Sequence, residues 1–176
     1  MRNRRAPIIA GIVGVAVLAL VVLFATSPSG EEKVDSSPLV GNVAPELVGT
    51  SIDGSDFDLD DHRGQWVLVN FFATWCPPCV QEHPELVELS ERTDGQIQVV
   101  SVTYDDSADE VTEFFEERGG EWPVLIGGVD RAPLDYGVRK LPESFLVDPS
   151  GTIAVKLNGA ITAAQVDELI AGGSGS

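Results

Sequence analysis

The sequence predicts an α/β domain built around a central sheet, and three observations support that prediction. Residues 66–72 and 97–103 are nearly continuous apolar runs of strand length, which is typical of central strands buried on both faces. The segment between them has helical character up to about Arg92, so the three pieces form a βαβ unit. Of the 176 residues, 43% are apolar, which is enough to bury a core.

The chain begins with a segment unlike the rest. Three arginines within residues 1–5 precede an uncharged run of 20 residues, 6–25, which would span roughly 30 Å as a helix and so match a bilayer's hydrocarbon thickness. Because arginines hold their side of a span in the cytoplasm, we predict a cytoplasmic basic segment (1–5) and a transmembrane signal anchor (6–25) in the plasma membrane, crossing once. The alternative is a cleaved signal peptide, whose apolar region is usually shorter, about 7 to 15 residues. Both interpretations export the body of the chain.

Two segments flank the body. Residues 26–43 contain many proline, glycine and serine residues, which is typical of an extended linker. At the other end, residues 172–176 are only glycine and serine, and we expect a flexible tail. The α/β domain is therefore predicted to occupy residues 44–171.

Turn signals and periodicity predict the other elements of the domain. Two short apolar stretches flank the turn pair Asp53-Gly54, which indicates an N-terminal β-hairpin at 47–59. After the βαβ unit, an amphipathic helix at 109–118 ends at Gly119-Gly120. Three short strands follow, the last two of them paired across a turn, and then a closing helix capped by Thr162. Their expected ranges are 123–126, 144–147, 152–157 and 162–171.

The charge of the chain is strongly acidic. There are 28 acidic and 11 basic residues, a formal net charge of −17. After residue 30 the balance is 28 acidic against 8 basic residues, a net charge of −20. Such a surface repels phosphate, and there is no basic stripe interleaved with aromatic residues, so nucleic-acid binding is excluded.

The only two cysteines, Cys76 and Cys79, lie where the first apolar strand ends and the next helix begins. A bridge across two residues closes almost no loop and would stabilise the fold little. The helix N-terminus stabilises a thiolate at Cys76, which we expect to be exposed, and Cys79 one turn further can resolve a mixed disulfide. Structural zinc needs four ligands, which one cysteine pair and two scattered histidines do not provide. A CxxCH haem-attachment motif is excluded because residue 80, which would be its histidine, is valine. The pattern favours thiol-disulfide exchange.

Three neighbours bear on the redox direction. Pro77 and Pro78 lack N–H groups, so two donors that could stabilise a Cys76 thiolate are missing, and we expect a more reducing couple. Glu82 falls on the apolar arc of the helix, one turn after Cys79. A buried carboxylate there would repel a thiolate, have a raised pKa and relay a proton to the thiols. The alternative is a glutamate at the edge of the arc that reaches solvent.

Several motifs now combine. The first is residues 67–79 (VLVNFFATWCPPC) with Glu82, preceded by Ala44-Pro45 and the predicted hairpin. The second is residues 136–138 (YGV) and 141–148 (LPESFLVD), followed by Gly151. Together they resemble the TlpA/ResA/CcmG family of membrane-anchored, extracytoplasmic proteins over about residues 44–171. The resemblance implies a thioredoxin-like fold, with a central mixed sheet flanked by helices, an N-terminal β-hairpin extension and a single N-terminal transmembrane helix.

The resemblance also implies roles for individual residues. In this family the first cysteine of the motif attacks and the second resolves, which maps onto Cys76 and Cys79 as a redox-active disulfide. The family's acidic residue maps onto Glu82. The proline that is cis and abuts the disulfide in thioredoxin folds maps onto Pro142; from the residues alone it could be a strand-start proline. We expect Trp75 to shield the sulfur and shape the contact surface.

The chain departs from the pattern of the family that it resembles near Pro142. Cytochrome c maturation members often carry Gly-x-Pro-Glu-Thr, whereas this chain has Lys140-Leu141-Pro142-Glu143-Ser144. Glu143 is expected to be a second carboxylate near the thiols. Lys140 lies beside Arg139, and this pair of cations could either orient an acidic partner or offset local repulsion.

The expected activity is thiol-disulfide exchange outside the cytoplasm without a cofactor, in the direction that reduces protein disulfides. Apocytochrome c is the candidate substrate, and a membrane electron donor of the CcdA/DsbD type would re-reduce the pair. Three alternatives stay open: an oxidant that installs disulfides, a copper-handling metallochaperone that uses the paired cysteines, and a peroxidase. The peroxidase alternative is the weakest because the Pro-x-x-x-Thr-x-x-Cys pocket is absent from the sequence.

Overall fold

The computed structural model describes residues 37–92 and 97–173. The predicted cytoplasmic segment, the signal anchor and most of the linker therefore lie outside the described residues. Within the described ranges, no helix combines the length and apolar character needed to cross a bilayer.

Seven strands form one mixed sheet in the order β2-β1-β5-β4-β3-β6-β7. Neighbours β3, β4 and β5 run parallel, and every other pair is antiparallel. The strands are β1 (Val48–Ser51), β2 (Asp56–Asp58), β3 (Trp66–Phe72), β4 (Ile97–Thr103), β5 (Val124–Gly127), β6 (Glu143–Val147) and β7 (Ile153–Asn158). This is the mixed sheet that the family resemblance implied, with β3 near its centre.

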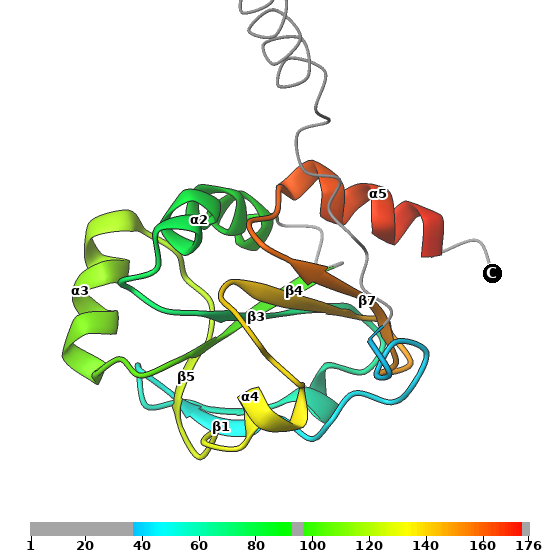
Figure 1. The fold of residues 1–176 in the computed structure, drawn as a ribbon, viewed down its shortest axis with the longest axis horizontal. Coiled ribbons are helices and arrows are strands. Elements are labelled where there is room, and N and C mark those ends of the chain that lie inside the picture. Colours follow the sequence, from blue (N-terminus) through cyan, green and yellow to red (C-terminus); the bar gives the residue numbers. More distant parts are fainter. Residues whose placement is uncertain (1–36, 93–96, 174–176) are drawn as a thin grey trace, which may run out of the picture. The chain divides into compact units, whose positions relative to one another are not determined.

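Helices cover both faces of this sheet (Figure 1). They are α2 (Pro77–Ser90), α3 (Ala108–Arg118), α4 (Ala132–Asp135), α5 (Ala163–Gly173) and a short 3-10 helix, η1 (Leu59–His62). One core cluster joins α2, α3 and α5 to one face through residues such as Leu68 and Leu89. A second cluster packs α4 and η1 on the other face, around Phe71 and Tyr136.

The helices and strands predicted within residues 44–171 are confirmed, and local sequence explains their bounds. All seven residues of β3 are buried, as expected for a strand covered on both faces. Helix α3 begins with a capping box in which the Ser107 side chain accepts from the Glu110 backbone while Glu110 accepts from the Ser107 backbone. Helix α2 begins with two prolines, a position where their missing N–H groups cost no helical hydrogen bond. The short helices η1 and α4 were not predicted, because four residues are too few for a periodicity to be recognised.

Two predicted boundaries need correction. Residues 37–43, assigned to the linker, pack on the domain: the backbone N–H of Gly41 donates to Ile153, and Val43 forms a bridge with Thr152. These contacts lie far apart in sequence, so the linker's composition could not reveal them. The closing helix α5 extends to Gly173 and so includes the first two residues of the predicted tail. Residues 174–176 lie outside the described ranges.

Candidate functional site

Cys76 and Cys79 form a disulfide at the N-terminus of α2, with their Cα atoms 5.2 Å apart. Cys76 is the N-cap residue in an extended conformation, and its backbone N–H donates to the Ala73 carbonyl at 3.2 Å. Strand β3 ends four residues before Cys76, and α2 begins directly after it and packs on one face of the sheet. The expected exposure of Cys76 is wrong, because only 4% of the residue is accessible.

The first turn of α2 lacks donors, as the sequence indicated. Pro77 and Pro78 occupy the first two helical positions, and no side chain caps the helix. Of the first three positions, only Cys79 has a backbone N–H that can face a charged sulfur. This geometry offers a Cys76 thiolate less stabilisation than an ordinary helix N-terminus would.

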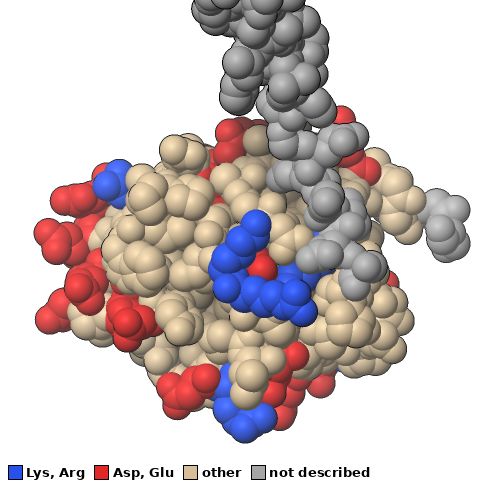
Figure 2. Space-filling model, in the orientation of Figure 1, with Lys and Arg blue, Asp and Glu red and all other residues tan. Residues whose placement is uncertain are grey.

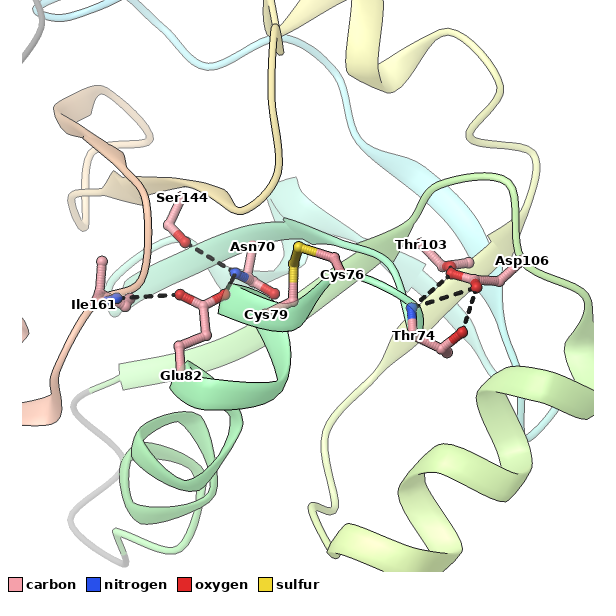
Figure 3. Close-up of a disulfide and its surroundings, with 9 residues drawn as sticks. All are labelled: Asn70, Thr74, Cys76, Cys79, Glu82, Thr103, Asp106, Ser144 and Ile161. Carbon is pink, nitrogen blue, oxygen red and sulfur yellow. Dashed lines mark hydrogen bonds between the residues drawn. A yellow bond between two sulfur atoms is a disulfide. The ribbon is translucent and has the colours of Figure 1, made fainter.

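Glu82 lies on the buried side of α2, with 1% of the residue exposed, so the solvent-facing alternative is wrong. Its carboxylate accepts hydrogen bonds from the Asn70 side-chain amide (2.8 Å) and the Ile161 backbone N–H (3.2 Å), toward which Figure 3 shows it turned. Burial raises the pKa of Glu82 to about 7, and the two hydrogen bonds limit that rise. Glu82 can therefore hold or release a proton near neutral pH, one turn from Cys79.

Asn70 connects Glu82 to a buried polar network that the sequence analysis missed. Besides Glu82, its amide nitrogen donates to the Ser144 hydroxyl at 3.0 Å. Its oxygen accepts from the Ser101 hydroxyl at 3.4 Å, and Ser101 accepts from the Trp122 indole at 2.8 Å. A signal was present, because Asn70 is the only polar residue in a strand predicted to be buried on both faces, and such a residue needs partners.

Asp106 holds the loop that leads into Cys76, and it too was missed. Its carboxylate accepts from the backbone N–H of Thr74 (3.2 Å) and from the Thr74 hydroxyl (2.6 Å), and it also accepts from the Thr103 hydroxyl. These bonds, drawn in Figure 3, join the loop after β3 to the end of β4. Asp106 therefore fixes the backbone just before Trp75 and Cys76.

Glu143 is not the second carboxylate beside the thiols that the sequence analysis expected. Its carboxylate pairs with the ammonium of Lys156 at 2.9 Å, and both side chains are buried. Lys156 also lies over the ring of Phe145, a residue of the core cluster on the sheet face opposite α2. Because side chains alternate along a strand, Ser144 faces the disulfide side and Glu143 the other. The sequence could not reveal Lys156 as the partner.

Pro142 is buried at the entrance to β6, and the Leu141–Pro142 peptide bond is cis, which confirms the isomer implied by the resemblance. Its carbonyl accepts from the Gly159 N–H at 3.0 Å. The neighbouring Leu141 lines a groove together with Cys76, so the two motifs of the sequence meet at one place.

This groove has a volume of about 440 Å³ and reaches Cys76. Trp75 is part of its lining, with 61% of the residue exposed. The lining residues are mostly apolar: Trp75, Cys76, Pro77, Pro78, Tyr104, Pro133, Val138, Arg139, Lys140 and Leu141. Arg139 and Lys140 thus line the same groove as Cys76, a placement that the sequence analysis did not give.

Comparisons with known proteins agree with this geometry. Residues 39–170 match the Redoxin family. The thiol-disulfide oxidoreductase ResA of Bacillus cereus is 32% identical over 143 residues, which are 81% of this chain and 80% of that protein. The thiol:disulfide interchange protein HelX of Rhodobacter capsulatus is 34% identical over 176 residues, covering 94% of this chain and 92% of HelX.

A solved structure extends the match to three dimensions. The thiol:disulfide interchange protein of the thioredoxin family from Chlorobium tepidum superposes with a TM-score of 0.66 at 27% identity, over 78% of this chain and 97% of that one. With the cysteine pair at the N-terminus of α2, these similarities identify the chain as a member of the Redoxin family and, within it, of the TlpA/ResA/CcmG group of thioredoxin-fold protein thiol-disulfide oxidoreductases.

Proposed function

We propose that this oxidoreductase reduces protein disulfides outside the cytoplasm, with Cys76 as the nucleophile and Cys79 as the resolving residue. The observation that carries the proposal is the placement of the Cys76–Cys79 disulfide at the end of a groove, one helical turn from the buried Glu82.

The proposed reaction has two exchange steps. In the reduced protein, the Cys76 thiolate attacks one sulfur of the substrate disulfide, forming a mixed disulfide and releasing the other substrate sulfur as a thiolate. Cys79 then loses its proton and attacks the Cys76 sulfur, which releases the second substrate thiolate and leaves the Cys76–Cys79 disulfide. Two electrons pass to the substrate, whose thiolates take up protons. The Glu82 carboxylate, with its pKa raised to about 7, is positioned to accept the Cys79 proton.

The reducing direction is supported by two features of α2. Pro77 and Pro78 withhold two N–H donors from the thiolate, and the Glu82 carboxylate adds negative charge when it is ionised. Both destabilise the thiolate form of the reduced pair relative to a disulfide. Glu143 does not support the reducing direction, because its charge is compensated by Lys156.

The N-terminal sequence supports a proposal for the cellular setting. We propose that residues 6–25 anchor the chain in the plasma membrane with its N-terminus in the cytoplasm, and that Trp75 and Pro142 help to present the disulfide. A membrane dithiol donor of the CcdA/DsbD type would return two electrons to the oxidised pair. Apocytochrome c is the proposed substrate, in line with the family resemblance.

The redox potential of the full-length chain, equilibrated with glutathione, tests the direction. We expect a value more reducing than about −180 mV, whereas a value near about −120 mV would indicate an oxidant that installs disulfides. Each 30 mV corresponds to about 1.4 kcal/mol for this two-electron couple. Tight stoichiometric Cu(I) binding without any disulfide reduction would favour the metallochaperone instead.

Trapping identifies the substrate. A Cys79→Ser variant expressed in its native cell envelope should stay disulfide-linked to its partner through Cys76, because the resolving sulfur is missing. The Cys76→Ser variant is the matched control and should trap no partner. Equal trapping by both variants would contradict the assigned roles.

A further inference from the structure

The groove beside the disulfide is apolar and open, which the exchange chemistry alone does not require. Trp75 and Tyr104, two large side chains of its lining, are 61% and 50% exposed. Exposing such side chains to water is unfavourable, and patches of this kind mark sites where another molecule binds. The groove is therefore shaped for an apolar side chain next to the sulfur that Cys76 attacks.

The charged residues of the groove are all basic. Arg139 and Lys140 are the only charged residues in its lining, both are exposed, and neither forms an ion pair with a carboxylate of the described residues. Figure 2 shows a group of basic side chains near the middle of the view, with an acidic group between them, while most of the other acidic side chains lie toward the edges. The lining of this groove is therefore basic, although the chain as a whole has a net charge of −17.

Carboxylates near these two cations have other partners. Glu143 accepts from the backbone N–H of Arg139 at 3.3 Å, and its charge is compensated by Lys156. Asp106 follows the groove residue Tyr104 but is bonded to Thr74, and Asp135 of α4 pairs with Arg131. Arg139 and Lys140 are therefore the charged side chains of the groove lining that a docked segment meets directly.

We propose that this groove selects protein disulfides whose flanking segment carries an apolar side chain beside the cysteine and aspartate or glutamate next to it. The apolar side chain packs against Trp75 and Tyr104, and the carboxylate pairs with Arg139 or Lys140. The inference rests on the proposed reductase function, since it names the class of substrate for the same exchange step. It assigns Arg139 and Lys140 a role in specificity, through attraction of the correct partner and repulsion of basic ones.

Three synthetic peptides test the proposal. Each contains the same intramolecular disulfide flanked by leucine, and the next residues are Asp-Glu, Ser-Gln or Lys-Lys. The full-length chain, reduced and in detergent, is mixed with each peptide, and the rate of its oxidation is divided by the rate at which dithiothreitol reduces that peptide. This ratio removes differences in the peptides' own reactivity.

We expect the acidic peptide to react about 10-fold faster than the basic one at low salt, and the ratio to approach one in 0.5 M NaCl. In the double variant Arg139→Gln/Lys140→Gln the acidic-to-basic ratio should fall to about one. Arg131→Gln is the matched control, an exposed arginine outside this groove, and should keep the ratio of the unaltered chain.

The two hypotheses fail in different ways. If all peptides are reduced but at equal normalised rates, or if the basic peptide is fastest, the selectivity proposal is wrong and the reductase function stands. If no peptide and no small disulfide oxidises the reduced chain, the proposed function itself is wrong. A loss of selectivity in Arg131→Gln equal to that in the double variant would show that net charge, and not the groove, controls the rates.

Discussion

The side-chain amide of Asn70, in the middle of β3, donates a 2.8 Å hydrogen bond to the carboxylate of Glu82, one turn after Cys79. Both residues are almost fully buried. A carboxylate in such a site is costly to ionise, and its two donors, Asn70 and the Ile161 N–H, offset only part of that cost. The proton on Glu82 is therefore exchangeable near pH 7, and the following predictions concern its effects.

Replacing Glu82 with Gln should change how stability depends on pH. The pKa of Glu82 is raised from 4.5 to about 7, so the folded protein binds more protons than the unfolded chain between these values. Its contribution to stability is fully present below pH 4.5 and is lost as pH rises toward 7, by at most about 1.4 kcal/mol per pH unit. Urea unfolding of the oxidised protein at pH 5 and pH 8 should show this loss, and Glu82→Gln should reduce it. If the free energy of unfolding changed equally between pH 5 and pH 8 in both proteins, the ionising group would be a residue other than Glu82.

The same substitution should make the reduced thiols reactive at lower pH. An ionised Glu82 repels a thiolate one turn away, and a neutral amide does not. The rate of alkylation by iodoacetamide, measured against pH in the reduced protein, should shift to lower pH in Glu82→Gln. Glu85→Gln, on the same helix but bonded to the Ala163 N–H, is the control and should leave the profile in place.

Asn70→Asp should destabilise the protein more at pH 8 than at pH 5. The change sets a second carboxylate against Glu82 in a buried site, where two like charges cannot both ionise cheaply. It also removes the donors to Glu82 and Ser144, a loss of about 1–3 kcal/mol at either pH. Ser144→Ala deletes only one hydrogen bond of the network and should cost about 1 kcal/mol with no dependence on pH. Equal losses at the two pH values in Asn70→Asp would argue against a charged Glu82.

Asp106→Asn should slow disulfide exchange without unfolding the protein. The amide has one acceptor oxygen in place of two, so at least one of the donors on Thr74 and Thr103 loses its partner, at a cost of about 1–3 kcal/mol. The loop before Cys76 then loses its attachment to β4. Exchange with a small disulfide should fall several-fold, as measured by stopped-flow. Asp105→Asn removes the same charge from the neighbouring exposed residue and should leave the rate unchanged.

Lys156→Met should be strongly destabilising, because it leaves the buried Glu143 carboxylate without its cation. Removing one partner of a buried pair costs about 3–5 kcal/mol. In Glu143→Gln/Lys156→Met, the amide can still accept from the Arg139 N–H, and most of that loss should be recovered. Because the pair lies on the opposite face from the disulfide, the redox potential of the double variant should match that of the unaltered chain. A shift of 30 mV or more would mean that Glu143 does act on the thiols.

The parts of the fold that depend on local pattern could be predicted. Continuous apolar runs identified β3 and β4, and the turn residues of both hairpins indicated their pairing. Helical periodicity alone placed Glu82 on the buried side of α2, because the angular position of each residue around a helix can be compared with the arc of apolar residues. The pairing of β1 with β5 was out of reach, because it joins segments more than 70 residues apart.

The sequence by itself determined where the chemistry is: a cysteine pair after the most apolar strand, two prolines without donors and a glutamate one turn further along α2. Tertiary structure decided what surrounds it. Strand register set Ser144 beside Asn70 and turned Glu143 toward Lys156, and the packing of two loops brought Arg139 and Lys140 to the groove at Cys76. The reason is physical: a helix face is a property of consecutive residues, whereas the partner of a buried polar group depends on which strand, in which register, lies opposite.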